Sequence, residues 1–579
     1  MPDPFSSRVP TRWPAARLPM LIALVLACLG AAACPHPAVR STPSPITQLP
    51  DTGSGPLAIV DVTVIVQPDA PALPHQTVVV IDGMITAVGP AARTVVPGGA
   101  VRIPGAGRFL MAGLTDMHVH VFDRDEFLLY LANGITTIRN LSGYAMHLAW
   151  RDSLATGLIA GPRLVTSGPI LDGDPPMRTT NTVLRDAAAG EAEVQREMAA
   201  GYDLVKVYDN ISPIAYRAVT AAAHRLGMRV AGHVPTPVGL ATVLAPGGQD
   251  EIEHLEELLP YFDDGRSAAG LDSIARAIAS AGVTVTPTLT VYASALAQAS
   301  DWAAVQARPE MRYVNPATRA QWGWDQTAAA RSGQSREVAR YLRTTAFFRD
   351  QLLPALRRAG VTLLVGSDAP IATLVPGFSL HDELMLLSAA GVSDQDVLTM
   401  ATVNAAAATG AASHRGAVRV GHDADLLLLG ADPRHGLAAL KDRVGVIAAG
   451  RWYAQRELNR RLNALAAVYR VVGLYDTKVT RLEGNCPLGT EDAETEVTVG
   501  ASPSVVLLRH GGTTYGGRLE DDGRFRMGER TVQVDGTDYH LAVEGRFRAE
   551  VLDARVTVTW GSAPTCRVIV NWHGPRRMG

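Results

Sequence analysis

The chain lacks the motifs that mark several common enzyme classes. It offers no serine nucleophile elbow and no P-loop, and the Gly-X-Gly at residues 53–55 stands outside any strand-to-helix context. Its formal net charge is only −3, which argues against a nucleic-acid partner. With 579 residues, 47% of them hydrophobic, the chain is globular in composition and too long for a single core.

Cysteine is also scarce, with four residues in the whole chain. Cys28 falls within an apolar N-terminal segment that we expect to be removed. Cys486 and Cys566 both lie in the C-terminal region, and an oxidising compartment would allow them to pair. We predict a disulfide between them; the alternative is two separate buried thiols.

The N-terminus resembles an export signal. Three arginines between residues 8 and 17 precede an apolar run over 18–30, and three alanines at 31–33 offer a cleavage site. The apolar run is too short to span a bilayer comfortably. We therefore predict a signal peptide over residues 1–34 and a periplasmic or membrane-anchored protein.

Cys34 directly follows the alanines, as in a lipoprotein processing site. Such signals usually carry leucine three residues before the cysteine, where this chain has Ala31. Lipidation of Cys34, with a membrane tether, and plain cleavage both stay open. Residues 35–56 are rich in Pro, Ser and Thr and are expected to form a disordered linker.

The rest of the chain divides by its hydrophobic pattern. β-rich pieces on both flanks of the central segment have too few strands to form separate sheets, so we expect one composite, β-sandwich-like domain. A helical pattern and a run of alternating β-strands follow. The predicted domains are 57–110 with 414–455 (composite β-domain), 111–413 (central domain), 456–472 (connecting helix) and 473–579 (C-terminal all-β domain).

The central segment alternates apolar strands with helical stretches, which favours a parallel sheet. Eight strands over about 300 residues fit a (β/α)8 barrel, whose active site lies at the carboxyl ends of its strands. The segment 289–360 is longer than a single crossover helix requires. We expect it to be helical and either to cover the mouth of the barrel or to pack on its outside. The predicted strands are 113–120, 134–139, 163–167, 204–208, 229–233, 251–254, 284–288 and 361–368.

Six side chains that can bind metal fall at or near the ends of these strands. His118 and His120 are two residues apart, so one face of a strand presents both to the same ion. Imidazole and carboxylate ligands on a rigid barrel, with a coordination position left open, suit metal-activated hydrolysis. The six are His118, His120, Lys206, His233, His254 and Asp368.

This pattern resembles the amidohydrolase superfamily, and most closely its imidazolonepropionase-like and Xaa-Pro dipeptidase-like members. The resemblance spans roughly residues 57–453. One departure is Asn140, where relatives often carry aspartate, although this is not a ligand position. Beyond the six side chains, the resemblance rests on G-I-T-T-I-R-N (134–140), H-D-E-L-M-L-L-S-A-A-G (381–391), A-T-V-N-A-A-A-A-T-G (401–410) and G-H-D-A-D-L-L-L-L (421–429).

The resemblance implies two divalent metal ions, with zinc favoured by the ligand types. His118, His120 and Asp368 would hold the first ion, and His233 and His254 the second. Lys206 would bridge them as a carbamate. Asp368 would move a proton from water to the leaving amine, and His254 would ligate or assist catalysis.

Two further residues are candidates for substrate binding. Tyr208 lies one strand step beyond Lys206 on the same face and would contact a substrate carbonyl or carboxylate. Arg139 ends the second strand and would pair with an anionic substrate group. Ordinary packing or internal ion pairing is the alternative for both.

The expected function is hydrolysis of C–N bonds in small substrates such as dipeptides or N-acyl amino acids. A mononuclear cyclic-amide hydrolase or deaminase is the nearest alternative, with one ion on His118, His120, His233 and Asp368. An exported binding protein that works through its C-terminal β-domain is the alternative outside the enzymes.

Overall fold

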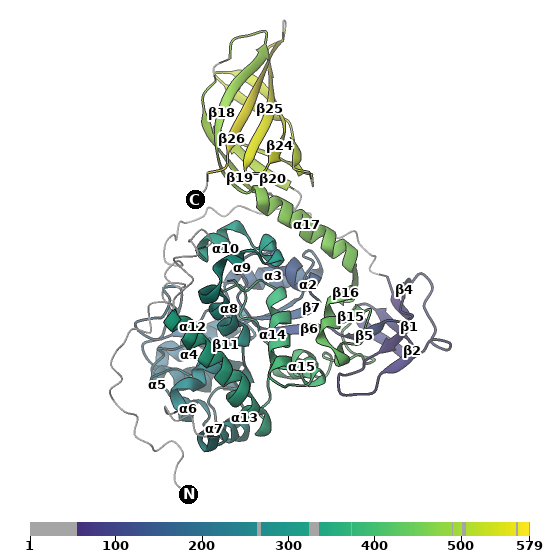
Figure 1. Cartoon of the computed structure of the whole chain (residues 1–579), viewed down its shortest axis with the longest axis vertical. Helices are drawn as coiled ribbons and strands as arrows, with labels where there is room; N and C mark the ends of the chain where they lie inside the picture. The colour runs from purple at the N-terminus through teal and green to yellow at the C-terminus, as the bar shows by residue number, and fades with distance from the viewer. Residues whose placement is uncertain are drawn as a thin grey trace. The chain divides into compact units, whose positions relative to one another are not determined.

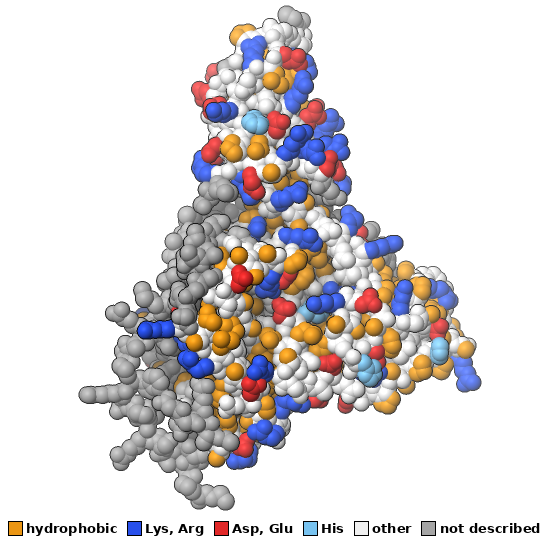
Figure 2. All heavy atoms as spheres, viewed as in Figure 1, with side chains coloured by type: hydrophobic (Ala, Val, Ile, Leu, Met, Phe, Trp, Pro, Cys, Tyr) orange, Lys and Arg blue, Asp and Glu red, His pale blue; other side chains and the backbone are white. Residues whose placement is uncertain are grey.

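A computed structural model describes residues 55–262, 268–323, 335–371, 373–488, 490–500, 505–520, 522–562 and 565–577 (Figure 1). The predicted signal peptide, Cys34 and the linker up to residue 54 lie outside the described residues. Among the helices described, none is both long and apolar enough to cross a membrane. On the face drawn in Figure 2, acidic and basic side chains are intermingled, as the small net charge leads one to expect.

The chain forms two compact units. Within the described residues, the first unit covers 55–308 and 335–458, and the second covers 309–323 and 459–577. Helix α17 (Gln455–Val471) crosses the boundary between them.

One sheet of the first unit takes strands from both flanks of the central segment. Its order is β17-β16-β15-β5-β1-β2-β3, and β4 also pairs with β1. The four leucines of β15 are buried and pair antiparallel with β5, which joins residues more than 300 positions apart. The strands are β1 (Leu57–Val64), β2 (Leu73–Ile81), β3 (Met84–Pro90), β4 (Val101–Pro104), β5 (Phe109–Ala112), β15 (Leu426–Leu429), β16 (Arg443–Ala448) and β17 (Arg451–Ala454).

The central strands are all parallel, and their pairings follow one another round a closed circuit. A bridge between Ser167 and Leu204 joins β8 to β11, and residues 361–369 bridge to β14 at Leu363 and to β6 at Ala369. The strands are β6 (Leu114–Val119), β7 (Ile135–Asn140), β8 (Arg163–Thr166), β11 (Leu204–Val207), β12 (Arg229–Gly232), β13 (Glu251–Glu253) and β14 (Thr284–Thr286).

The eighth predicted strand, 361–368, is not a regular strand. It is held by the two bridges and by backbone hydrogen bonds such as Asp368 N to His118 O at 2.7 Å. Its backbone leaves the extended region at Asp368, where φ is 58°. Two short strands that the sequence pattern missed, β9 (Leu171–Asp172) and β10 (Thr182–Val183), lie between β8 and β11.

Capping residues mark both ends of helix α4. Helix α4 starts after Asp186, whose side chain accepts a hydrogen bond from Ala189 N, and it stops at Gly201 in the left-handed region. The connecting helices are α2 (Glu126–Ala132), α3 (Ala145–Thr156), α4 (Ala187–Ala200), α5 (Pro213–Arg225), α6 (Leu240–Val243), α7 (Ala268–Ala281), α14 (Phe378–Ala389), α15 (Asp394–Thr399) and α16 (Ala405–Ala408).

The described part of the 289–360 insertion is helical, as predicted. Most of its helices belong to the first unit, whereas α10 is grouped with the second. The helices are α8 (Leu289–Ser300), α9 (Trp302–Gln306), α10 (Pro316–Gln321), α12 (Ser335–Phe347) and α13 (Leu353–Arg358).

Residues 473–577 form an antiparallel barrel, which confirms the predicted all-β region and adds its closure. Eight strands run in the order β22-β21-β20-β19-β18-β26-β25-β24, and a β22–β24 pairing closes the ring. A disulfide joins Cys486 and Cys566, whose Cα atoms are 5.5 Å apart. The strands are β18 (Gly473–Gly484), β19 (Ala493–Val499), β20 (Val505–His510), β21 (Thr513–Leu519), β22 (Arg524–Met527), β23 (Arg530–Val534), β24 (Thr537–Arg548), β25 (Val551–Trp560) and β26 (Cys566–Pro575).

Candidate metal centre

Three of the predicted ligands meet at the carboxyl end of β6. His118 and His120 point the same way from this strand, and their Nε2 atoms lie 3.3 Å and 2.9 Å from Oδ1 of Asp368. All three residues are buried, and each offers a ligand atom within 4.8 Å of the others. The histidines hold the pKa of Asp368 well below its usual value, although burial acts in the opposite direction.

Lys206 lies on β11 and faces the same interior. It is 1% exposed, and its Nζ has no hydrogen-bond partner among the described residues. Burial lowers its pKa, and the nearby carboxylates of Glu253 and Asp368 oppose that shift. A buried amine whose neutral form is favoured is the form that can react with carbon dioxide.

His254 follows β13 and lies beside His118, with their ring centroids 4.5 Å apart. Its Nδ1 is 2.7 Å from the hydroxyl of Thr288 and 4.0 Å from Oδ2 of Asp368. Burial lowers its pKa well below the ordinary histidine value, and the neighbouring His118 disfavours its protonation further. A neutral imidazole with a fixed orientation is the state that ligates a metal.

His233 follows β12, and its ring lies 4.9 Å from that of His254. Its Nδ1 is 2.7 Å from Asp209 and 3.1 Å from Glu257, so two carboxylates flank it. His233, Asp209 and Glu257 form a second group whose ligand atoms lie within 4.8 Å of one another. Burial disfavours the charged ring, but the two carboxylates raise the pKa of His233 well above its ordinary value.

Several polar atoms at this centre are buried without a hydrogen bond. Within the described chain these include Nε2 of His118, Oδ1 of Asp368 and Nζ of Lys206. Burying such atoms without a partner costs free energy, and native proteins normally satisfy them. Nitrogen and carboxylate donors converging on one point suit a divalent cation of the zinc type, so the residues present fit a metal.

Comparisons with known proteins agree with this geometry. The family model described as "Amidohydrolase family" matches residues 109–453, more than half of the chain. The chain belongs to this family. The resemblance noted from the motifs is therefore confirmed.

Solved structures have a fold similar to that of this amidohydrolase. A Bifidobacterium longum protein described as a candidate prolidase has 25% identity and a TM-score of 0.52, covering 69% of this chain and 95% of its own. A bottromycin amidohydrolase has 24% identity and a TM-score of 0.59, covering 72% and 90%. A Xaa-Pro dipeptidase with bound methionine has 18% identity and a TM-score of 0.52, covering 69% and 100%. Among curated proteins, none matches the chain.

A buried ion-pair network lies behind the candidate metal ligands of the amidohydrolase. Glu253 Oε2 lies 2.7 Å from His118 Nδ1, and Glu253 Oε1 lies 2.7 Å from an Arg139 guanidinium nitrogen. Arg139 also forms a two-point contact with Glu251 and donates a 2.7 Å hydrogen bond to Met117 O. The carboxylate of Glu253 therefore orients the ring of His118 so that Nε2 faces the centre.

This network corrects the expectation that Arg139 binds substrate. The residue is 1% exposed, and its guanidinium is occupied by two internal carboxylates and a backbone carbonyl. An anionic substrate group would have to displace buried, charge-assisted hydrogen bonds to reach it. Arg139 is therefore engaged in internal ion pairs, the alternative stated for it in the sequence analysis.

Asp368 is itself held in place by a residue that the motifs did not highlight. Asp116 accepts hydrogen bonds from Ser367 N at 2.9 Å and from Ser367 Oγ at 2.6 Å. Burial raises the pKa of Asp116 to about 7. Asp368, His254 and Thr288 all have φ between 47° and 71°, so the backbone is strained where three chain segments reach the centre.

Tyr208, the second predicted substrate residue, lies at the rim of the centre. Its ring is 4.1 Å from that of His233, and it is 8% exposed. Burial raises the pKa of its hydroxyl, so the phenol stays protonated and can donate a hydrogen bond.

Sequence reasoning missed Glu253, Asp209, Glu257 and Asp116. A usable signal existed for Glu253, because the alternation in E-I-E (251–253) places Glu251 and Glu253 on the face that also presents Arg139. Asp209 lies in a turn after β11 and Glu257 in the short 3-10 helix Leu255–Tyr261 after β13, and neither segment has a strand alternation that would have indicated where the side chain points.

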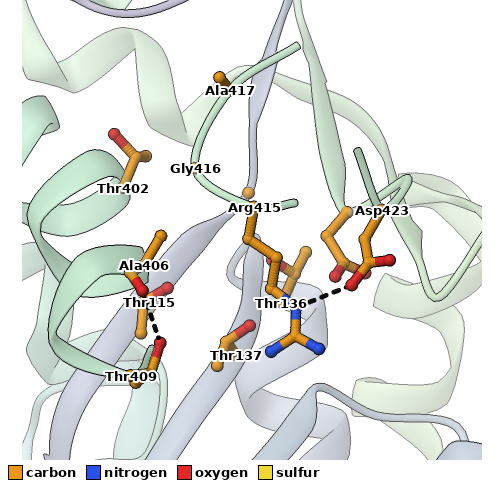
Figure 3. A pocket seen from close by; sticks show the side chains of 12 residues that line it. Thr115, Thr136, Thr137, Thr402, Ala406, Thr409, Arg415, Gly416, Ala417 and Asp423 are labelled. Atoms are coloured by element: carbon orange, nitrogen blue, oxygen red, sulfur yellow. Dashed lines mark hydrogen bonds and ion pairs between the residues drawn. The ribbon is translucent and has the colours of Figure 1, made fainter. Parts of the chain in front are cut away.

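A separate hollow lies at the other end of the central strands (Figure 3). It is lined by Gly113 and Thr115 before and at the start of β6, by Thr136 and Thr137 of β7, and by an ion pair between Arg415 and Asp423 at 2.8 Å. Because His118 and His120 leave the opposite end of β6, this hollow does not belong to the metal centre.

Proposed function

We propose that this amidohydrolase is a metal-dependent hydrolase of C–N bonds in small substrates, working at the carboxyl ends of a (β/α)8 barrel. Dipeptides and N-acyl amino acids are the substrates that we favour. The convergence of His118, His120 and Asp368, with buried polar atoms left without hydrogen bonds, carries the proposal. The closed circuit of parallel pairings supports the barrel.

His118, His120 and Asp368 would hold one divalent ion, and His233 and His254 would hold a second, with a carbamate of Lys206 between them. Zinc is the metal that this donor set favours. Bound there, divalent cations supply hydroxide at neutral pH and polarise the scissile carbonyl.

The protein side chains have their own tasks in this proposal. Asp368 is ionised, because the neighbouring histidines depress its pKa, and in this proposal its carboxylate takes a proton from the attacking water. It then passes this proton to the leaving nitrogen. Glu253 keeps the ring of His118 in one orientation throughout, and burial of the centre excludes competing solvent.

One observation bears on the number of ions. His233 Nδ1 is already flanked by Asp209 and Glu257, and this group forms a cluster separate from that of His118, His120 and Asp368. If His233 stays with those carboxylates, it would hold no second ion, and a single ion would rest on His118, His120 and Asp368. The mononuclear alternative, a cyclic-amide hydrolase or deaminase, adds His233 to that set and requires its ring to leave the two carboxylates.

Metal analysis of the purified protein distinguishes the two-ion centre from the one-ion centre. The proposal expects two divalent ions per chain and hydrolysis of Xaa-Pro dipeptides or N-acyl amino acids; one ion per chain selects the alternative. The carbamate predicts a labelled carbonyl resonance from ¹³CO₂ that is lost in Lys206→Ala and kept in the control Lys478→Ala on β18. Full metal content and rate in Lys206→Ala would eliminate the bridge.

We also propose that the protein is exported, on the strength of the basic, apolar and small-residue order of residues 8–33. The mass of the mature N-terminus tests this directly. A diacylglycerol-modified Cys34 would establish a lipoprotein. An unmodified N-terminus near residue 34 would establish cleavage without lipidation. A chain that keeps Met1, in whichever cell fraction it is found, would contradict removal of the signal peptide.

A further inference from the structure

Glu383 is a buried carboxylate within the motif at residues 381–391, and its side chain is directed at α8. It lies on α14, which packs against α8 (Figure 1). Its two oxygens accept hydrogen bonds from Leu289 N at 3.0 Å and from Thr290 N at 2.8 Å. These are the first N–H groups of α8, which have no acceptor within their own helix. Glu383 therefore caps α8 from a different helix.

The residue before this turn, Thr288, holds the ring of His254. Its hydroxyl lies 2.7 Å from Nδ1 of His254. When Nδ1 donates to that hydroxyl, the lone pair that a metal or a proton needs is left on Nε2. Although Thr288 stands at the N-cap position of α8, its own side chain makes no capping hydrogen bond, because it is turned to the histidine.

This arrangement requires an unfavourable backbone at Thr288. Its φ of 47° and ψ of 48° are left-handed, a region that β-branched residues rarely adopt. Such a conformation persists only where neighbouring contacts maintain it. The two hydrogen bonds to Glu383 are made by the next two residues of the chain, so they are placed to maintain it.

The same turn of α8 also contacts the segment that carries the acid of the centre. The hydroxyl of Thr290 donates to Ser367 O at 3.2 Å, directly before Asp368. Nδ1 of His254 lies 4.0 Å from Oδ2 of Asp368. One turn, held from α14 by Glu383, therefore touches both the histidine and the segment of the acid.

We infer that Glu383 is a positioning residue for the centre: it holds the first turn of α8 so that Thr288 fixes the ring of His254. The inference rests on the proposed function, which gives His254 its task as a ligand or in catalysis. A purely structural role for Glu383 would change the stability of the protein without acting through Thr288. The two roles differ in whether substitutions at Glu383 and Thr288 are coupled.

A double-mutant cycle on metal affinity tests this coupling. Affinity for cobalt(II) is measured by chelator competition in Glu383→Gln, Thr288→Val and the double variant, and urea unfolding records the stability of each. Thr288→Ser keeps the hydroxyl and serves as the conservative variant. The matched control is Asp186→Asn, which alters an exposed carboxylate that caps α4 by accepting from Ala189 N at 2.8 Å.

Each single variant, Glu383→Gln and Thr288→Val, should lower cobalt affinity by about 10-fold. The double variant should lose no more than the weaker of the two, because both remove the same support of His254. Thr288→Ser and Asp186→Asn should bind cobalt as the wild-type protein does. Wild-type affinity in Glu383→Gln, or additive losses that reach about 100-fold in the double variant, overturns the inference.

The metal-free protein gives a second readout that needs neither metal nor turnover. In protein labelled with ¹⁵N-histidine, the Nδ1 resonance of His254 is identified by its loss in His254→Gln. Glu383→Gln and Thr288→Val should shift this resonance in the same direction, whereas Asp186→Asn should leave it in place. An unmoved resonance in Glu383→Gln overturns the inference. A wild-type protein that binds no divalent metal and hydrolyses no substrate overturns the proposed function, and the resonance then decides the inference alone.

Discussion

The imidazole Nδ1 of His118 lies 2.7 Å from Oε2 of Glu253, a residue 135 positions away in the sequence. Both side chains are fully buried. The other oxygen of Glu253 contacts Arg139, so one carboxylate links a metal-ligand candidate to the ion-pair network inside the ring of strands. The orientation of His118 therefore depends on three strands, β6, β7 and β13, and not on its own backbone alone.

We expect Glu253→Gln to weaken metal binding. The amide keeps the shape of the side chain but lacks the charge that fixes the protonated nitrogen of His118, and such changes typically cost 10–100-fold in affinity (order of magnitude). Competition with a metal chelator measures the change. Glu191→Gln, at a side chain that is 48% exposed and pairs with Arg225, serves as control and should bind metal normally. Unchanged affinity in Glu253→Gln would show that the contact does not orient His118.

Removing the charge of Arg139 should destabilise the first unit strongly. Arg139→Met leaves two buried carboxylates, Glu251 and Glu253, without their cation, and breaking a buried pair in this way costs about 3–5 kcal/mol. Urea unfolding of the full chain measures the effect. Arg151→Met, which removes a partly exposed pair with Asp203, should cost about 1 kcal/mol or less. A similar small cost for both variants would contradict the buried network.

A methyl group at Gly366, which is not itself a candidate ligand, should damage the centre by displacing the segments that carry His118 and Asp368. An added Cβ would lie 2.7 Å from Cβ of His118 and 2.7 Å from Cγ2 of Thr286, so the segment before Asp368 must shift. Small displacements of this kind lower activity by about 100-fold. Hydrolysis rate and metal content are measured in Gly366→Ala and in Gly98→Ala, where no heavy atom lies within 4 Å of the added carbon. Wild-type activity in both variants would refute the tight packing.

Acid should destabilise the protein partly through His381, which lies on α14. Burial lowers its pKa to about 3, and its Nε2 lies 2.9 Å from Asn133 O. The unfolded chain takes up this proton below pH 6.5 while the folded chain does not, so stability falls from about pH 6.5 towards pH 3. At pH 5 this contribution is about 2 kcal/mol by linkage.

The variant His381→Gln isolates that contribution. The drop in unfolding free energy between pH 7.5 and pH 5 should be smaller than in the wild-type protein by about 2 kcal/mol. His435→Gln is the control, because the side chain of His435 is 76% exposed. An unchanged pH dependence in His381→Gln would show that His381 protonates in the folded state.

The local hydrophobic pattern predicted most of the strands of the central segment and the all-β character of the C-terminal region. Apolar runs of four to six residues between helical stretches located the central strands, and the alternation of β6 correctly places His118 and His120 on one face. The C-terminal region was recognised as all-β from its turns. The eighth segment departed from expectation because its backbone bends at Asp368 to aim the carboxylate at the histidines.

Alternation also misleads at one point. On β13 it places Glu251 and Glu253 on one face and would turn His254 to the other. The φ of 71° at His254 ends the extended backbone, and its ring reaches the same centre as His118. Only the contacts of neighbouring strands can maintain such a conformation, so no local rule foresees it.

The sequence by itself determined the order of strands and helices, the chemical types of the ligands and the family, because these depend on periodicity and motifs that are read along the chain. The tertiary structure decided which of the two residues predicted to bind substrate is engaged in internal ion pairs. The two acids of β13 pair with Arg139, whereas the ring of Tyr208 lies beside that of His233 at the centre. Charge neutralisation depends on distances across the fold, which residue spacing does not encode.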